Sequence, residues 1–421
     1  MIRFALKNMA IKKVQIILVV ISIILSAGIA VLAFNVSNQV SDGISKNAQY
    51  YSVIVGPSGS KTQLAMNSMY FSDSPLGTIP YSVVTELSQD NNVREAVPFA
   101  MADNYNGSSV VGTTPTYLKD KELSSGEMFK EHGSFEAVIG YRVAKENGLK
   151  VGDTLYTSHS ATGGQAHEKG LTVVGILEQS YTSFDTVVFT QVRSLWELHD
   201  HGDEHDEASG AHGEETGKGE DGASHEGEEE HHDHSNEKTV CAVLVRAKNP
   251  SVAMTIIEKY NGMVIENEGE NPISLQAISP MEAVRDVLND ADNTKYIVFV
   301  LCAVILVMNI MIISIITLLN MYHSSKEIAL MRLIGISMKK INLLYLIQNS
   351  IIGLFSTAMA FGLSRICLAL MNDYVSSMGV VLNIGKIYPL EIIILVGVFL
   401  ISVLPTAIWT FVMSKKDSIS G

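Results

Sequence analysis

Histidines are concentrated in one short stretch of this chain. Eight of its twelve histidines fall within 36 consecutive positions, among glycine, aspartate and glutamate. Imidazole nitrogen binds Zn²⁺, Cu²⁺ and Ni²⁺, and the spacings H-x-H, H-x₃-H and H-H-x-H let several nitrogens reach one ion. The sequence therefore predicts that this stretch binds a transition metal, with Zn²⁺ as the first candidate. The predicted metal ligands are His199, His201, His205, His212, His225, His231, His232 and His234.

The residues around these histidines cannot build an apolar core. We therefore predict that residues 193–238 form a disordered insertion rich in histidine, aspartate and glutamate. A catalytic site is not expected there, because catalysis requires a fixed geometry. Two interpretations stay open: a zinc-responsive or zinc-capturing loop, and a solvated acidic loop whose histidines bind metal incidentally. His132, His159 or His167 would complete a site if the loop folded back onto them.

The formal net charge of −14 comes from the same stretch. Residues 197–237 contain sixteen acidic side chains and one lysine, a net charge of −15, so the rest of the chain is nearly neutral. No basic surface or nucleic-acid-binding motif is evident in the sequence. A phosphate-binding glycine loop and a catalytic triad in a strand-turn-helix context are also missing from it, which argues against a stand-alone enzyme.

Four apolar segments are each long enough to cross a hydrocarbon core of about 30 Å. They cover residues 14–34, 296–320, 341–370 and 388–413. A large polar block separates the first from the second. The expected fold is a membrane protein with four transmembrane α-helices in a one-plus-three layout. A cleaved signal peptide is the alternative for the first segment, but its apolar run is too long for one.

The positions of lysine and arginine predict on which side of the membrane the segments between the apolar ones lie, because these residues are enriched on cytoplasmic flanks. Residues 1–13, 321–340 and 414–421 carry these basic residues and are expected to be cytoplasmic. The block 35–293 is then extracytoplasmic. Arg365 lies near the outer end of the third segment, where we expect it to reach the interface. An ion pathway through the helices is therefore not expected.

The extracytoplasmic block alternates short β-rich runs with helical patterns, which predicts an α+β domain. A strand–helix–strand pattern occurs in residues 35–120 and again in residues 239–293, and we expect the two parts to form one domain. Residues 121–192 between them are expected to form a small β-rich lobe. Within that lobe, Gly140 and Gly148 are interpreted as residues that begin and end a short helix.

The loop between the second and third apolar segments has an amphipathic pattern. Ile328, Met331 and Ile334 or Gly335 repeat at helical spacing, with charged residues on the other sides, so the apolar residues can dock in a groove. Gly335 permits a sharp turn before the next helix. The alternative is a helix that lies on the membrane surface and binds lipid headgroups.

Several segments resemble the permeases of MacB-, LolC/LolE- and FtsX-like ABC transporters of type VII. Outside the membrane the resemblance is carried by "GYRVAKENGLKVGDTL" and "LTVVGILEQSYTSFDTVVF", and in the cytoplasm by "HSSKEIALMRLIGISMKK". The histidine-rich insertion is not part of the family pattern. The residues that match the family's ATPase-coupling pattern are Lys326, Glu327, Ile328, Ala329, Met331, Arg332, Gly335 and Lys340.

The resemblance implies a transmembrane permease subunit in the inner or plasma membrane of a bacterial cell. ATP and Mg²⁺ would bind to a separate cytoplasmic ATPase, so no cofactor and no enzymatic activity are expected in this chain. The chain would pair with a second copy or a related permease, and an extracytoplasmic adaptor or lipoprotein is a further candidate partner. It would relay ATP-driven motion to its extracytoplasmic, MacB-like domain.

The cargo stays open at this point. A lipoprotein, a peptide, a hydrophobic compound and a metal-linked cargo all suit a permease that exports or extracts its substrate. One alternative is an FtsX-like mechanotransmitter, which controls an extracytoplasmic partner protein and carries no cargo. The other is a regulator that responds to metal through the histidine-rich loop.

Overall fold

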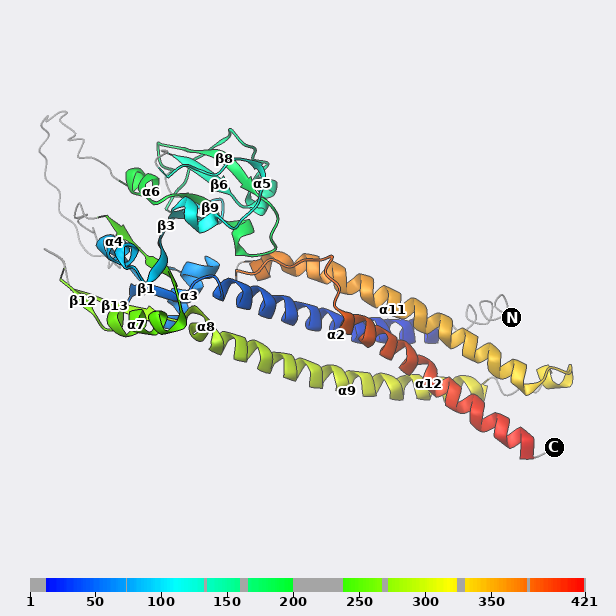
Figure 1. Ribbon diagram of the computed structural model, residues 1–421. Coiled ribbons are helices and arrows are strands. Elements are labelled where there is room, and N and C mark those ends of the chain that lie inside the picture. Colours follow the sequence, from blue (N-terminus) through cyan, green and yellow to red (C-terminus); the bar gives the residue numbers. More distant parts are fainter. Residues whose placement is uncertain are drawn as a thin grey trace, which may run out of the picture. The chain divides into compact units, whose positions relative to one another are not determined.

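A computed structural model describes residues 13–72, 74–131, 135–159, 166–199, 238–266, 272–323, 330–376 and 379–419 of the chain. The chain divides into two compact units (Figure 1). The helical unit comprises Met1–Gln49, Tyr181–Ser183 and Met281–Gly421. The sheet unit comprises Tyr50–Ser180 and Phe184–Pro280.

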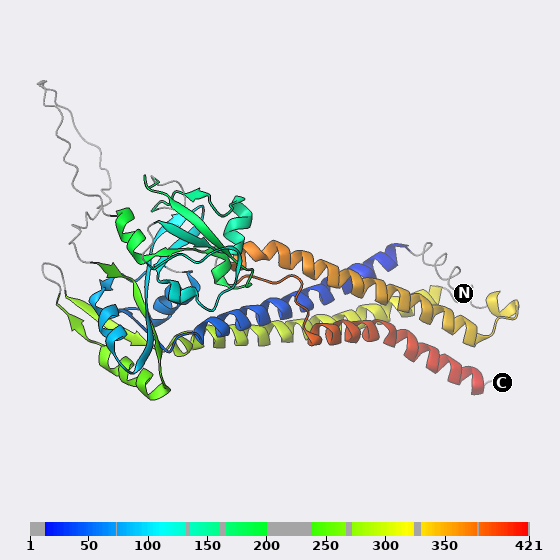
Figure 2. The ribbon, with the colours of Figure 1, turned by 45° about the horizontal axis from the view of Figure 1, so that its top comes forward.

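Long helices make up the described part of the helical unit. They are α2 (Lys13–Ala48), α9 (Arg285–His323), α11 (Met338–Ser376) and α12 (Pro389–Ile419). They run alongside one another, and α2 contacts the other three (Figure 2). Apolar side chains fill the space between α2, α11 and α12, where Ala27 and Ala360 are fully buried. Small residues line this contact, and a Cβ atom added at Gly28 would make an ordinary van der Waals contact, 3.5 Å from the carbonyl oxygen of Ala360.

Three helical stretches among the described residues are long and apolar enough to cross a membrane. They are Lys13–Ala48, Lys340–Ser376 and Pro389–Ile408, and they contain the first, third and most of the fourth predicted segments. The second predicted segment lies in α9, where the apolar stretch Tyr296–Ile312 is shorter. The combination of apolar helices with an α+β unit is therefore confirmed, and the layout of four spans stays a prediction.

The described part of the sheet unit is built on thirteen strands. In chain order they are β1 (Val53–Pro57), β2 (Ile79–Pro80), β3 (Val93–Tyr105), β4 (Ser108–Thr113), β5 (Leu123–Gly126), β6 (Glu136–Ile139), β7 (Thr154–Leu155), β8 (Leu171–Leu177), β9 (Val188–Gln191), β10 (Thr239–Val240), β11 (Ala242–Ala247), β12 (Val264–Ile265) and β13 (Ile273–Ile278). Eleven of them join in the order β12-β13-β1-β11-β3-β4-β9-β6-β8-β5, with β7 paired to β8. β2 and β10 form a separate pair. Strand β11 lies between β1 and β3, so a strand from the later part of the sequence is inserted between two strands from its beginning.

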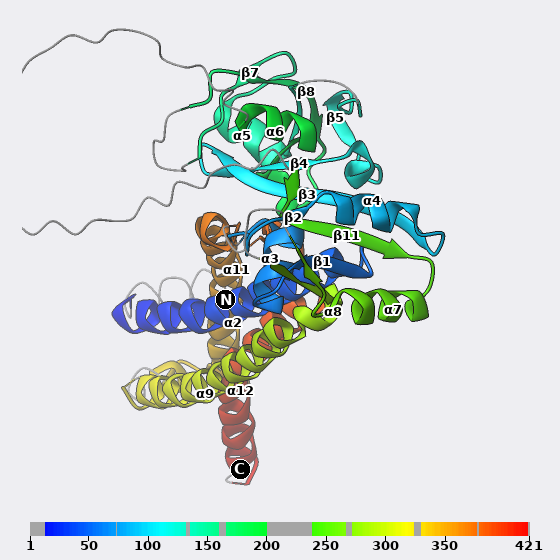
Figure 3. The same cartoon turned by 90° about the vertical axis from the view of Figure 1, so that its left-hand side faces the viewer.

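Short helices connect and cover the strands. They are α3 (Lys61–Tyr70), α4 (Ser82–Gln89), η1 (Pro115–Leu118), α5 (Tyr141–Asn147), η2 (Ser183–Thr186), α6 (Val192–His199), α7 (Pro250–Tyr260) and α8 (Pro280–Ala283). Figure 3 shows α5 and α6 with β7 and β8 toward one end of the sheet unit, and α4 and α7 with β11 toward the other. One continuous apolar core extends between these ends, from Val243 on β11 to Val173 on β8.

Glycine sets both ends of α5, as the sequence predicts. The helix begins after Gly140 and ends at Gly148, whose φ of +67° is left-handed. A side chain disfavours that conformation, so glycine is suited to the position. Gly140 has an ordinary φ of −64° and is required for a different reason, because a Cβ atom there would lie 2.3 Å from the carbonyl oxygen of Phe184.

The predicted disordered insertion begins too early in the sequence. Residues 192–199 form α6, and three of its apolar side chains are buried. The indole nitrogen of Trp196 donates a hydrogen bond to the carbonyl oxygen of Thr239 (2.8 Å). The boundary at residue 193 was therefore wrong, because a helix of two turns can be held by packing although polar residues make up half of it. Residues 200–237 lie outside the described residues.

Candidate metal centre and coupling segment

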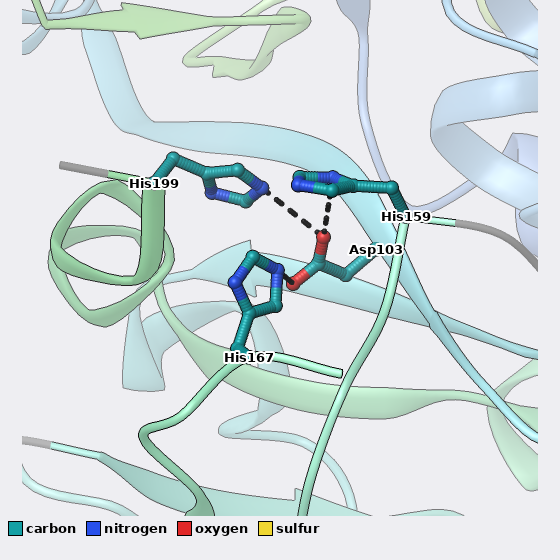
Figure 4. A group of neighbouring side chains, drawn as sticks. All are labelled: Asp103, His159, His167 and His199. Carbon is teal, nitrogen blue, oxygen red and sulfur yellow. Dashed lines mark hydrogen bonds and ion pairs between the residues drawn. The ribbon is translucent and has the colours of Figure 1, made fainter. Parts of the chain in front are cut away.

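Four side chains of the sheet unit meet around one point: Asp103, His159, His167 and His199 (Figure 4). Asp103 lies on β3, His199 is the last residue of α6, and the other two lie between β7 and β8. Each side chain offers one ligand atom, and the four atoms lie within 4.8 Å of one another. The fold thus gathers three imidazoles and one carboxylate from distant positions in the chain.

Backbone pairing places the two histidines of the β7–β8 segment against β3. Asn104 and Ser158 exchange two backbone hydrogen bonds, with N–O distances of 2.8 and 3.0 Å. The amide of His167 donates to the carbonyl oxygen of Thr157 (2.8 Å). On β3 itself the register with β4 shifts just before Asp103. Such a bulge redirects a side chain, and Asp103 points toward the histidines (Figure 4).

Helix α6 supplies the third imidazole in a defined orientation. Its buried apolar face packs on β3, β4 and β9, and His199 lies at its C-terminal end. The Nδ1 atom of His199 lies 2.7 Å from the carbonyl oxygen of Leu195. Because a carbonyl only accepts, Nδ1 carries a proton and Nε2 is directed at the cluster. Metal-binding histidines commonly have their outer ring nitrogen held in this way.

Asp103 is the centre of the cluster, and its side chain is 0% exposed. Its Oδ1 lies 3.1 Å from Nε2 of His199 and 3.3 Å from Nδ1 of His159, and its Oδ2 lies 3.1 Å from Nε2 of His167. The hydroxyl of Thr157 donates to Oδ2 (2.8 Å). The side chain of His159 is 58% exposed, whereas that of His167 is buried. The cluster is therefore accessible from solvent at His159.

The contacts of the cluster determine its charge. Burial raises the pKa of Asp103, but the hydrogen bond and charge of His199 and the hydrogen bond of Thr157 outweigh it and hold that pKa at about 2. Burial lowers the pKa of His199, but the hydrogen bond to Asp103 prevails and raises it. Asp103 is therefore ionised at neutral pH and can act as an anionic metal ligand.

Three members of the cluster, all histidines, are candidates named from the sequence, and the fourth is not. His199 was among the eight predicted ligands, and His159 and His167 were considered as residues that would complete a site. Asp103 was missed, because its spacing to the histidines has no recognisable pattern. Its one signal is an acidic residue within "PFAMADNY", the otherwise uncharged second part of the strand. The remaining predicted ligands lie outside the described residues: His201, His205, His212, His225, His231, His232 and His234.

The coupling segment is described from residue 330 onward. Its helical turn ends at Gly335, whose φ is +89°, and the amide of Ile336 donates to the carbonyl oxygen of Met331 (3.0 Å). This is a helix end with glycine in the left-handed conformation, which confirms the sharp turn predicted at this residue. Four residues of the predicted coupling pattern lie outside the described part: Lys326, Glu327, Ile328 and Ala329.

The apolar residues of this segment differ in exposure. Leu330, Leu333 and Ile334 are 62%, 84% and 73% exposed. Met331 instead packs against buried residues at the start of α11, which differs from its predicted place among the docking residues. Of these three exposed residues, the amphipathic spacing had included Ile334 and not the two leucines, and the docking role stays a prediction. Arg332 and Lys340 of the predicted pattern are exposed.

Arg365 of α11 forms a buried ion pair that the sequence did not reveal. Its guanidinium binds the carboxylate of Glu391 on α12, and the side-chain amide of Asn35 on α2 donates to the same carboxylate. Glu391 and Asn35 are fully buried. The guanidinium also donates to the carbonyl oxygen of Lys386 (2.9 Å). The charge of Arg365 is therefore neutralised by Glu391, and the expectation that Arg365 reaches the interface stays a prediction.

Comparisons with known proteins identify both halves of the chain. A family model described as the MacB-like periplasmic core domain matches residues 15–252, and one described as the FtsX-like permease C-terminal matches residues 297–418. No match was found among curated proteins.

Two solved structures are similar to part of the chain. The periplasmic region of MacB from Actinobacillus actinomycetemcomitans is 10% identical, with a TM-score of 0.35, and the match covers 59% of this chain and 98% of that one. The extracellular domain of the noncanonic ABC-type transporter YknZ from Gram-positive bacteria is 11% identical, with a TM-score of 0.31, and the match covers 54% of this chain and 99% of that one.

Proposed function

Because the chain belongs to the family of MacB- and FtsX-like permeases of type VII ABC transporters, we propose that it relays the ATP-driven motion of a separate ATPase to its extracytoplasmic domain. Members of this family are membrane subunits of ABC transporters, and their ATPase is a separate cytoplasmic subunit. The observation that carries the proposal is that the two family models account for residues 15–252 and 297–418. The sheet unit would be the part that moves outside the membrane.

The ATPase is proposed to dock on the exposed apolar face of the coupling segment, formed by Leu330, Leu333 and Ile334. Apolar side chains this exposed at a helix end favour a partner that covers them. The left-handed turn at Gly335 fixes how this face projects from α11. The exposed Arg332 would set the orientation of the docked ATPase, because charges at the rim of an interface contribute mainly to specificity.

The motion would serve to export or extract a substrate at the outer face of a bacterial inner or plasma membrane. Pairing with a second copy or a related permease is part of the proposal, because two subunits moving against each other can enclose and release a cargo. A lipoprotein, a peptide and a hydrophobic compound are the cargo classes to test first. In this mechanism the cargo is handled outside and does not have to cross the bilayer.

Replacing Leu333 by glutamate is expected to weaken binding of the cognate ATPase by roughly 30-fold, which corresponds to about 2 kcal/mol for the loss of an interface anchor. A charge at this position would be buried without a partner when the ATPase docks. Binding of the ATPase to the full chain in lipid nanodiscs measures the effect. The rate of ATP hydrolysis by the complex would show whether coupling is lost as well.

The same substitution at Met254 provides a matched control. Met254 lies on α7 of the sheet unit and is 71% exposed, so Met254→Glu adds an equal charge at an exposed apolar residue that a cytoplasmic ATPase does not reach. Its ATPase binding is expected to equal that of the parent chain. Unchanged binding and unchanged hydrolysis in Leu333→Glu would refute docking at this face and favour a segment held by lipid headgroups.

A further inference from the structure

We propose that Asp103, His159, His167 and His199 form a specific Zn²⁺ site with four protein ligands in the sheet unit. The site goes beyond the proposed relay function and does not depend on it, because binding of the ion involves the sheet unit alone. It uses only the first histidine of the histidine-rich stretch, His199, with which α6 ends, and its other three ligands lie outside that stretch.

The donor set selects the ion. Three imidazole nitrogens and one carboxylate oxygen suit Zn²⁺ and neighbouring transition metals, whereas Ca²⁺ and Mg²⁺ require mostly oxygen ligands. Four protein ligands complete a tetrahedral zinc site, and such sites hold structure together. A catalytic zinc ion would keep one position open for water. The proposed ion therefore has a structural or regulatory role.

The distances agree with a tetrahedral ion. Zinc bonds of about 2.0–2.2 Å place the ligand atoms of a tetrahedron roughly 3.3–3.6 Å apart. Oδ1 of Asp103 lies 3.1 Å from Nε2 of His199 and 3.3 Å from Nδ1 of His159, and Oδ2 lies 3.1 Å from Nε2 of His167. All four ligand atoms lie within 4.8 Å of one another, so the widest pair has to close by little more than 1 Å.

The orientation of the His199 ring also fits a metal ligand. Its Nδ1 proton is directed at the carbonyl oxygen of Leu195, so a neutral ring presents the lone pair of Nε2 to Oδ1 of Asp103 at 3.1 Å. This nitrogen is therefore placed to bind a metal, and the ring centroids of the two other imidazoles lie 4.9 and 5.0 Å from that of His199.

The origin of the ligands indicates what the ion would do. Asp103 belongs to β3 in the middle of the sheet, His159 and His167 to the β7–β8 segment, and His199 to the C-terminal end of α6. One ion would therefore cross-link three parts of the sheet unit that are distant in sequence. It would also fix His199, the last residue of α6.

The test requires a chain in which the other histidines of the histidine-rich stretch cannot compete. In this background chain, the seven histidines between residues 201 and 234 are replaced by glutamine, and the full chain is held in lipid nanodiscs. Zn²⁺ is titrated in competition with a chromophoric chelator. One equivalent of tightly bound Zn²⁺ per chain is expected. A background chain that binds no Zn²⁺ tightly would overturn the proposal, because it still contains all four proposed ligands.

Single substitutions in the background chain identify the ligands. His167→Ala and Asp103→Asn are each expected to weaken Zn²⁺ binding by more than about 100-fold, beyond the 10- to 100-fold typical of losing an outer hydrogen-bond partner. Glu168→Gln is the matched control, because it removes an exposed carboxylate next to His167 and is expected to change nothing. Equal affinities in all three variants would overturn the proposed ligand set.

A cysteine substitution covers the case in which His167→Ala or Asp103→Asn fails to fold. Cysteine is itself a good ligand for zinc and for Co²⁺, its spectroscopic substitute. His199→Cys in the background chain is therefore expected to bind Co²⁺ and to show a sulfur-to-cobalt charge-transfer band that the background chain lacks. A folded His199→Cys chain that takes up Co²⁺ without this band would exclude position 199 as a ligand and overturn the site.

Discussion

Replacing Glu391 by alanine is expected to lower the free energy of unfolding of the chain in lipid by about 3–5 kcal/mol. The substitution leaves the guanidinium of Arg365 among the helices without its carboxylate, and it removes the acceptor to which Asn35 donates. Leaving one buried charge uncompensated costs more than the pair itself contributes to stability. Unfolding of the full chain in mixed micelles with increasing denaturing detergent measures the effect.

Two further variants test whether the buried charge is the cause. The double substitution Arg365→Met/Glu391→Leu removes both charges and is expected to recover most of the lost stability, because apolar replacement of a whole buried pair is often neutral or stabilising. Lys386→Met removes the partner of Asp42 in a more exposed pair and is expected to cost less than about 1 kcal/mol. An equal loss in Glu391→Ala and in the double variant would contradict the ion-pair explanation.

The pairing of Arg365 with Glu391 shows where sequence reasoning fails for membrane helices. Each charged residue is visible in its own apolar segment, but their contact depends on how α11 and α12 are rotated and shifted against each other. Hydropathy carries no information on that register. The apolar segments predict which residues cross the membrane, but they do not predict how far each helix extends beyond it. Helix α2 continues through polar residues to Ala48.

The metal cluster could be predicted only in part, because long-range contacts also decide which residues it contains. The chemical type of the site followed from histidine density, and His159, His167 and His199 were all considered. The pairing of Ser158 with Asn104 then decides which strand residue completes the cluster, and a β-bulge decides that Asp103 points inward. Long-range strand pairing and irregular register are properties of the folded sheet that local sequence patterns do not specify.

Replacing Gly140 by alanine is expected to lower the free energy of unfolding of the sheet unit by about 3 kcal/mol, at the upper end of the cost of overpacking. The added Cβ atom would lie 2.3 Å from the carbonyl oxygen of Phe184 and 2.4 Å from backbone atoms of Asp185. Backbone atoms cannot move away as a flexible side chain can. Denaturant unfolding of the full chain measures the loss, with Trp196 on α6 as the fluorescent reporter after Trp409→Phe.

Gly148→Ala separates this steric effect from the conformational cost of replacing glycine. Gly148 ends the same helix with a φ of +67° and has open space around it, so alanine there costs only the strain of the left-handed conformation, about 1 kcal/mol. Gly140 has an ordinary φ, and its whole cost must come from the contact with Phe184 and Asp185. If Gly148→Ala proved the more destabilising of the two, the conformational cost at the C-terminal end of α5 would exceed the steric cost at its N-terminal end. That result would contradict the explanation given for Gly140.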